Sequence, residues 1–186
     1  FRYRDSDRRG FWDHAFCYGS VLATFCQGIV LGAFIQGFQT DGQAFTGGSF
    51  DCFTPFSLLT GVALLFGYAL LGAGWLIQKT EGELQAAMRR RGRWCLAGVL
   101  AGIVIVSAWT PLIDHDVAVR WFSTPDIFWL APIPILTALV AFWAWRALNS
   151  AEETTPFVAA VLLFLLSYGG IAVSLWPMIV PYHLTL

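Results

Sequence analysis

Five stretches of the chain contain no Asp, Glu, Lys or Arg, and each is long enough to cross a bilayer as a helix. A charge at the centre of such a helix costs roughly 2.5–3.5 kcal/mol, so spanning helices carry their charges at the ends. The pattern therefore predicts an all-α integral membrane protein with a single transmembrane domain over residues 1–186. The five predicted spans cover about residues 14–37, 52–78, 94–113, 127–146 and 156–177.

The composition argues against a soluble domain. Hydrophobic residues make up 57% of the chain and charged residues 12%. A soluble domain of this size could not carry that composition without large exposed apolar patches. The formal net charge of −1 says little by itself. The lipid bilayer is the expected surrounding, and no nucleic-acid partner is expected.

Basic residues gather on one side of the predicted membrane. If the spans alternate in direction, the segment before the first span and the links after the second and fourth lie on the same side. These three segments hold ten of the eleven Lys and Arg residues, and only Arg120 lies on the other side. The positive-inside rule makes the basic side cytoplasmic. We therefore expect a cytoplasmic N-terminus and external links around Asp41 and Asp116.

Threonine and proline mark the starts of several helices. Thr54 before Pro55 fits an N-cap followed by a first turn, where the missing N–H of proline costs little. Pro156 fits the same pattern in the fifth span. Pro132 and Pro134 fall within the first turns of the fourth predicted span, so a local distortion is expected there.

The segment Glu83–Arg91 allows two interpretations. Leu84, Ala87 and Met88 would share one face of a helix, which favours a short interfacial helix. A solvated helical turn between the second and third spans fits equally well.

The predicted spans contain almost no axial ligand for a heme, which needs His, Met or a similar side chain facing the interior of a bundle. His14 lies at the cytoplasmic edge of the first span, His115 in an outer link and His183 near the C-terminus. Met88 and Met178 also lie away from the span centres. We therefore predict that this segment holds no heme.

Metal and disulfide sites are equally poorly supported. Cys17 and Cys26 are nine residues apart and fall on opposite faces of a helix, while Cys52 and Cys95 belong near opposite membrane surfaces. A packing role is expected for all four. The triplet Asp114–His115–Asp116 is the most ligand-like cluster, but adjacent side chains diverge, which favours a solvated loop over a metal or proton-entry site.

Small residues define candidate helix-packing faces. Gly28, Gly32 and Gln36 recur at four-residue spacing on the first span, and small residues let helix backbones approach closely. The third and fifth spans repeat the pattern at Gly98, Gly102, Gly170 and Ser174.

A few polar side chains fall within or beside the spans. Gln27 could mark a pathway or form an interhelical hydrogen bond, as could Gln36. Tyr68 and Tyr168 could touch a quinone or a proton path, or could bond a backbone carbonyl of a neighbouring helix. Asp13 and Asp51 lie just outside the spans, and we expect them at the interface.

The chain resembles subunit II of cytochrome bd-type quinol oxidases, including the cyanide-insensitive branch, over the run Gly47–Gln85, GGSFDCFTPFSLLTGVALLFGYALLGAGWLIQKTEGELQ. The most distinctive pieces are TPFSLLTG, GYALLGA and KTEGELQ. Upstream support comes from FRYR, WDHAFCYGS and QGIVLGAFIQG, and a weaker match runs through the tail SLWPMIVPYHLTL.

The resemblance implies a two-subunit oxidase of the bacterial cytoplasmic membrane that oxidises a quinol such as ubiquinol and reduces dioxygen to water. Two b-type hemes and one d-type heme would lie in subunit I, and subunit II would be its heme-free partner. In this family a structural quinone is bound in some members. The segment would be an internal fragment that lacks the family's first and last helices.

The resemblance carries no catalytic, cofactor-binding or metal-binding residue onto this segment, because the family's proton-path carboxylates lie in its early helices. Two other interpretations stay open. A secondary transporter would use broken helices and polar groups near the midplane of the membrane. Gln27 and the Pro132–Pro134 pair are the only sequence features that support this interpretation. A pure assembly subunit is the third possibility.

Overall fold

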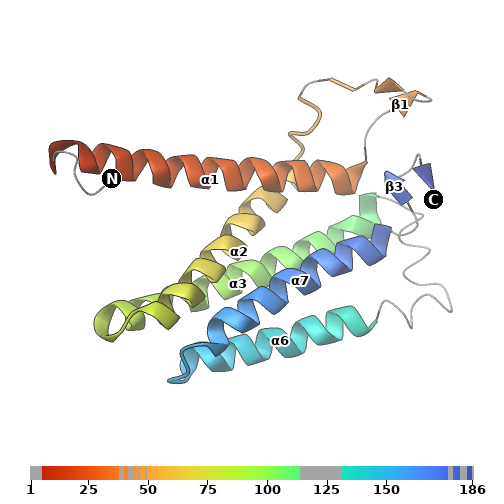
Figure 1. Ribbon diagram of the computed structural model, residues 1–186. Helices are drawn as coiled ribbons and strands as arrows, with labels where there is room; N and C mark the ends of the chain where they lie inside the picture. The colour runs from red at the N-terminus through yellow and green to blue at the C-terminus, as the bar shows by residue number, and fades with distance from the viewer. Residues whose placement is uncertain are drawn as a thin grey trace.

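Five helices form most of the computed structural model, which describes residues 6–37, 40–41, 44–45, 47–48, 50–113, 131–175, 178–180 and 184–185 (Figure 1). The helices are α1 (Ser6–Gln36), α2 (Pro55–Lys79), α3 (Gly82–Ile113), α6 (Pro132–Asn149) and α7 (Thr155–Leu175). Two short antiparallel pairs join β1 (Thr40–Asp41) to β2 (Ala44–Phe45), and β3 (Met178–Val180) to β4 (Leu184–Thr185).

Four of these helices are long and apolar enough to cross a membrane. The candidate spans are Gly10–Gln36, Pro55–Lys79, Gly82–Leu112 and Thr155–Ser174. The predicted all-α, multi-pass membrane fold is confirmed. The fourth predicted span, 127–146, begins in residues that lie outside the described part of the chain, and α6 covers the rest of it.

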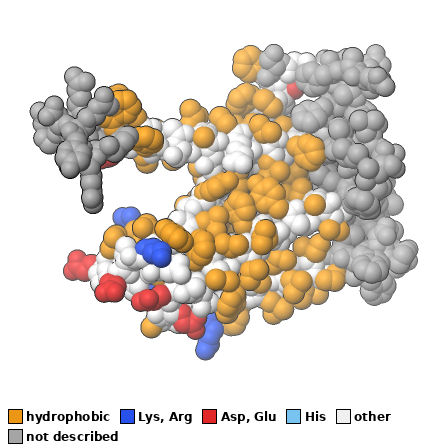
Figure 2. Space-filling model, in the orientation of Figure 1, with side chains coloured by type: hydrophobic (Ala, Val, Ile, Leu, Met, Phe, Trp, Pro, Cys, Tyr) orange, Lys and Arg blue, Asp and Glu red, His pale blue; other side chains and the backbone are white. Residues whose placement is uncertain are grey.

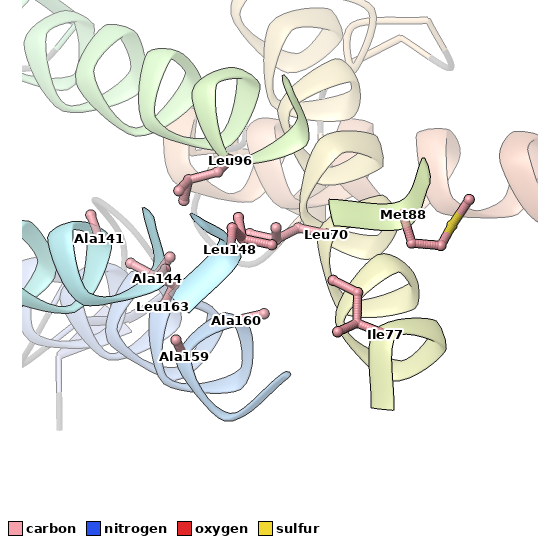
Figure 3. Close-up of a cluster of buried hydrophobic side chains, with 10 residues drawn as sticks. All are labelled: Leu70, Ile77, Met88, Leu96, Ala141, Ala144, Leu148, Ala159, Ala160 and Leu163. Atoms are coloured by element: carbon pink, nitrogen blue, oxygen red, sulfur yellow. The ribbon is translucent and has the colours of Figure 1, made fainter. Parts of the chain in front are cut away.

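An apolar core lies where α2, α3, α6 and α7 meet (Figure 3). Its buried residues come from all four helices and are Leu70, Ile77, Met88, Leu96, Ala141, Ala144, Leu148, Ala159, Ala160 and Leu163. Alanines supply much of the α6 and α7 sides of this core, and large side chains supply the α2 and α3 sides. Small side chains allow α6 and α7 to lie close together.

Helix α1 packs differently from the other four. Its second half lies against α2, whereas every residue from Gly10 to Ala23 is exposed. In Figures 1 and 2 the N-terminal half of α1 stands clear of the rest of the structure. The contact with α2 is therefore what holds α1 in place among the described residues.

Helix α3 is one continuous helix from Gly82, so both interpretations of the segment 83–91 as separate from the third span were wrong. Tertiary contacts explain the difference. Met88 is only 7% exposed within the apolar core, and Arg89 bonds to the connection between α6 and α7. Gly82 adopts φ +66°, which lets the chain turn within two residues after α2 ends at Lys79.

Thr54 caps α2 as predicted. Its side chain accepts a hydrogen bond from Ser57 N, the side chain of Ser57 accepts one from Thr54 N, and Pro55 is the first helical residue. Pro132 likewise occupies the first position of α6. Pro132 and Pro134 both lie in the first turn of α6, where no intrahelical N–H bond is lost, so α6 as described does not require the distortion expected at these prolines.

Candidate functional site

A close helix contact lies between the second half of α1 and the first half of α2. A Cβ atom at Gly28 would stand 2.5 Å from Gly61 Cα and 2.9 Å from the carbonyl oxygen of Thr60. A Cβ atom at Gly32 would stand 2.5 Å from Ser57 Cα and would overlap the Thr60 hydroxyl. Only glycine fits at these two positions without a shift of the α2 backbone.

Hydroxyl groups line the same contact. The hydroxyl of Thr60 is buried and lies 2.8 Å from both the carbonyl oxygen of Gly28, on α1, and the carbonyl oxygen of Ser57, on its own helix. At the end of α1, the hydroxyl of Thr54 donates to the side-chain oxygen of Gln36. Gln36 thus forms the interhelical hydrogen bond that was one of its two interpretations.

Tyr68 bonds to a side chain and not to a backbone carbonyl, so that expectation was wrong for this residue. Its hydroxyl donates to Gln27 Oε1 of α1 at 3.3 Å. The Tyr68 ring meets Phe164 of α7 edge-on at 5.4 Å, and Phe164 stacks on Tyr168 at 5.2 Å. A chain of contacts therefore links α1, α2 and α7 through one glutamine and three aromatic rings.

The glycines of α3 also face α2. A Cβ atom at Gly98 would stand 2.5 Å from the ring of Phe66, and one at Gly102 would stand 2.6 Å from Ala63 Cβ. These neighbours are side chains, so the contact is less strict than the one between α1 and α2. The functional importance of Gly28, Gly32, Gly98 and Gly102 in assembly stays a prediction.

Arg89 joins α3 to the connection between α6 and α7. Its guanidinium donates to the carbonyl oxygens of Ala147, Ser150 and Glu152 at 3.2, 2.6 and 2.7 Å. These carbonyls lie at and beyond the C-terminus of α6, where the last carbonyls lack i+4 donors, although that of Ala147 also accepts from Ser150 N at 3.2 Å. Sequence reasoning missed this role, since it treated Arg89 only as one charge of a cytoplasmic link.

The potential ligands are dispersed. His14 is exposed on α1, where its Nδ1 lies 2.6 Å from the carbonyl oxygen of Gly10, and Met88 is buried in the apolar core. Cys17 and Cys26 are exposed, which contradicts a packing role within the described chain, while Cys52 and Cys95 are partly buried. The described residues contain no group of three or more His, Cys, Asp or Glu that could hold a metal ion.

Neither His14 nor Met88 is placed as an axial ligand of a heme. A heme iron needs an axial ligand directed into a cavity of the bundle, whereas His14 lies on an exposed surface and Met88 packs among aliphatic side chains. The triplet Asp114–His115–Asp116 and His183 lie outside the described residues.

The comparisons with known proteins point to one family. The family model described as cytochrome bd terminal oxidase subunit II matches residues 1–186. The chain is also similar to a probable cytochrome oxidase subunit 2 of Haemophilus influenzae, with 29% identity over 161 residues. That alignment covers 74% of this chain and 42% of the relative, so the chain spans less than half the length of that relative.

Proposed function

The chain belongs to the cytochrome bd terminal oxidase subunit II family, and we propose from this premise that it is the heme-free subunit of a membrane-bound terminal oxidase. In this proposal the complex oxidises a quinol, such as ubiquinol, and reduces dioxygen to water. The match of the family over the whole chain is the observation that carries the proposal.

The heme-bearing chemistry is assigned to a partner, subunit I, in a heterodimer. The helices described here offer no suitably placed axial ligand, whereas they present large apolar surfaces to other helices or lipid. The proposed contribution of this subunit is therefore to pack against subunit I and to support access of oxygen and protons to it. Hemes of the b and d types would belong to subunit I, and a structural quinone would be an additional ligand of the complex.

The proposed location is the bacterial cytoplasmic membrane, with the N-terminus in the cytoplasm. The basic residues of the described helix ends support this orientation, because Lys79, Arg89, Arg93 and Arg146 all lie at the same end of the bundle. In Figure 2 the Lys and Arg side chains that are visible lie at that end, whereas acidic side chains are also seen elsewhere. Basic residues at one end are typical of a cytoplasmic surface.

A secondary transporter is less well supported. The two features that favoured a transporter have structural explanations. Gln27 accepts an interhelical hydrogen bond from Tyr68, and Pro132 is the first residue of α6. No broken helix is present among α1, α2, α3, α6 and α7 as described.

Co-purification distinguishes these functions. The full-length protein, tagged and extracted in mild detergent, should bring with it a second membrane polypeptide and the absorption bands of heme. Quinol oxidation coupled to oxygen uptake should be measured in the same chromatographic fractions as the two polypeptides and the heme. A protein that transports a solute when purified alone, with no heme-bearing partner, would contradict the proposal.

A further inference from the structure

We propose that the exposed seam between α3 and α6 binds the headgroup of an anionic phospholipid through Arg93 and Arg146. Each of these helix ends carries an Arg–Trp pair, Arg93 with Trp94 on α3 and Trp145 with Arg146 on α6, and we call the place where Arg93 reaches Asn149 the α3–α6 seam. Arg93 Nη1 donates to Asn149 Oδ1 at 2.8 Å, which brings the two helix ends together.

The hydrogen-bond partners separate these two arginines from their neighbour Arg89. The guanidinium of Arg89 donates hydrogen bonds to three backbone carbonyls at the end of α6. Arg93 uses one of its five N–H groups on Asn149. Arg146 has no hydrogen bond or ion pair with any residue that the structure describes, and it lies one turn before Asn149, so its side chain and that of Asn149 are neighbours on α6.

The surroundings of the two charges match an interfacial lipid. Trp94 is 76% and Trp145 is 54% exposed, and exposed tryptophans are typical of the headgroup level of a membrane. On α6, Ile135, Leu139 and Phe142 are exposed and recur on the same helix face as Arg146. The two arginines thus offer cations at the level of the headgroup, and the outward face of α6 below Arg146, opposite the core residues Ala144 and Leu148, offers an apolar strip for an acyl chain.

Charge complementarity selects an anionic lipid over a zwitterionic one. A guanidinium binds phosphate oxygens in a planar, bidentate geometry, which is stronger and more specific than a general surface attraction. Each basic residue near an anionic membrane surface also contributes to lipid attraction. Neither Arg93 nor Arg146 forms an ion pair with a carboxylate within the described residues.

The test is a lipid titration of the purified full-length complex, followed by native mass spectrometry. After delipidation, phosphatidylglycerol should bind more tightly than phosphatidylcholine with the same acyl chains. Arg93→Gln and Arg146→Gln should each weaken phosphatidylglycerol binding roughly fivefold. They should leave phosphatidylcholine binding unchanged.

Two matched variants control for charge and for structure. Arg91→Gln removes the same charge from the opposite side of α3, because two residues correspond to about 200° of helix rotation. Asn149→Ala removes the bond to Arg93 but keeps both cations. Both variants should retain phosphatidylglycerol affinity within about twofold, well inside the effect expected for a lost arginine.

Three results would overturn the proposal. Equal weakening by Arg91→Gln would show a diffuse basic surface, and equal affinity for the two lipids would show no role for the lipid charge. Displacement of phosphatidylglycerol by inorganic phosphate would assign the seam to a soluble anion.

Discussion

Gly28 and Gly32 set the distance between α1 and α2. Both lie where a side chain would collide with the α2 backbone, at Gly61 and Ser57 respectively. The neighbouring Thr60 hydroxyl reaches the carbonyl of Gly28 because no side chain intervenes. The absence of two side chains therefore permits both the close contact and its buried hydrogen bond.

Replacing Gly32 by Leu should separate α1 from α2 and impair assembly of the complex. Overpacking a close contact costs roughly 1–3 kcal/mol, and relief here requires movement of the Ser57 backbone. We expect a lower yield of assembled complex and a lower unfolding temperature. Size-exclusion chromatography and thermal unfolding of the purified complex measure both.

Gly72→Leu is the matched control for this variant. Gly72 lies on α2, and a Cβ atom there would have nothing within 4 Å among the described residues. Its substitution should be tolerated much better than that of Gly32. Normal assembly and stability of the Gly32→Leu variant would show that the close contact is not needed.

The structural role of a residue could be predicted from the sequence where its hydrogen-bond partners are close to it along the chain. Thr54 and Pro55 were predicted correctly because an N-cap and a first turn involve residues only three positions apart. The partners of Thr60 and Tyr68 lie 32 and 41 residues away, at Gly28 and Gln27. No local pattern identifies such partners, since they depend on how the helices pair.

At the scale of the elements, α3 does more than cross the membrane. Its first turns extend the helix beyond the predicted span and place Met88 in the core and Arg89 against the end of α6. The sequence suggested the amphipathic face of this segment but not its continuity with the span. Contacts 58 to 63 residues distant along the chain stabilise it.

Arg89→Gln should loosen the connection between α6 and α7. Hydrogen bonds to charged groups contribute about 1.5–3 kcal/mol each when well shielded, and this site is partly exposed, so a total loss of about 2 kcal/mol is expected. Amide hydrogen exchange of residues 150–154 in the purified complex should become faster. The unfolding temperature should fall.

Arg90→Gln provides the comparison, because Arg90 is exposed and has no bond to a described residue. Its exchange profile in residues 150–154 should resemble that of the unmodified protein. If both variants exchange alike, the three carbonyl contacts of Arg89 do not stabilise the connection.

At the scale of the whole molecule, we expect the two ends of α2 to lie at opposite membrane surfaces. Phe50, before α2, and Glu81, after it, are both exposed. In a background without other reactive cysteines, a cysteine at Glu81 should escape an impermeant thiol reagent in intact cells and react after permeabilisation of the cytoplasmic membrane. A cysteine at Phe50 should react in both conditions, and the reverse pattern would invert the proposed topology.

The all-α membrane fold could be predicted because charge-free stretches of sufficient length leave few alternatives. The arrangement of the helices could not. The Gly28–Gly32 face indicated a close contact without identifying its partner, and the exposed surface from Gly10 to Ala23 shows only that α1 packs on little within the described chain. Apolar surfaces that face lipid and apolar surfaces that face a partner subunit have the same composition. Subunit contacts therefore cannot be predicted from hydropathy.

Heme content of the purified complex tests the central claim most directly. His14, His115 and His183 are all the histidines of this chain, and we predict that replacing the three together by Ala leaves the heme-to-protein ratio and the visible spectrum of the complex unchanged. Loss of one heme, with both polypeptides still assembled, would show that this subunit supplies an axial ligand and would contradict its assignment as heme-free.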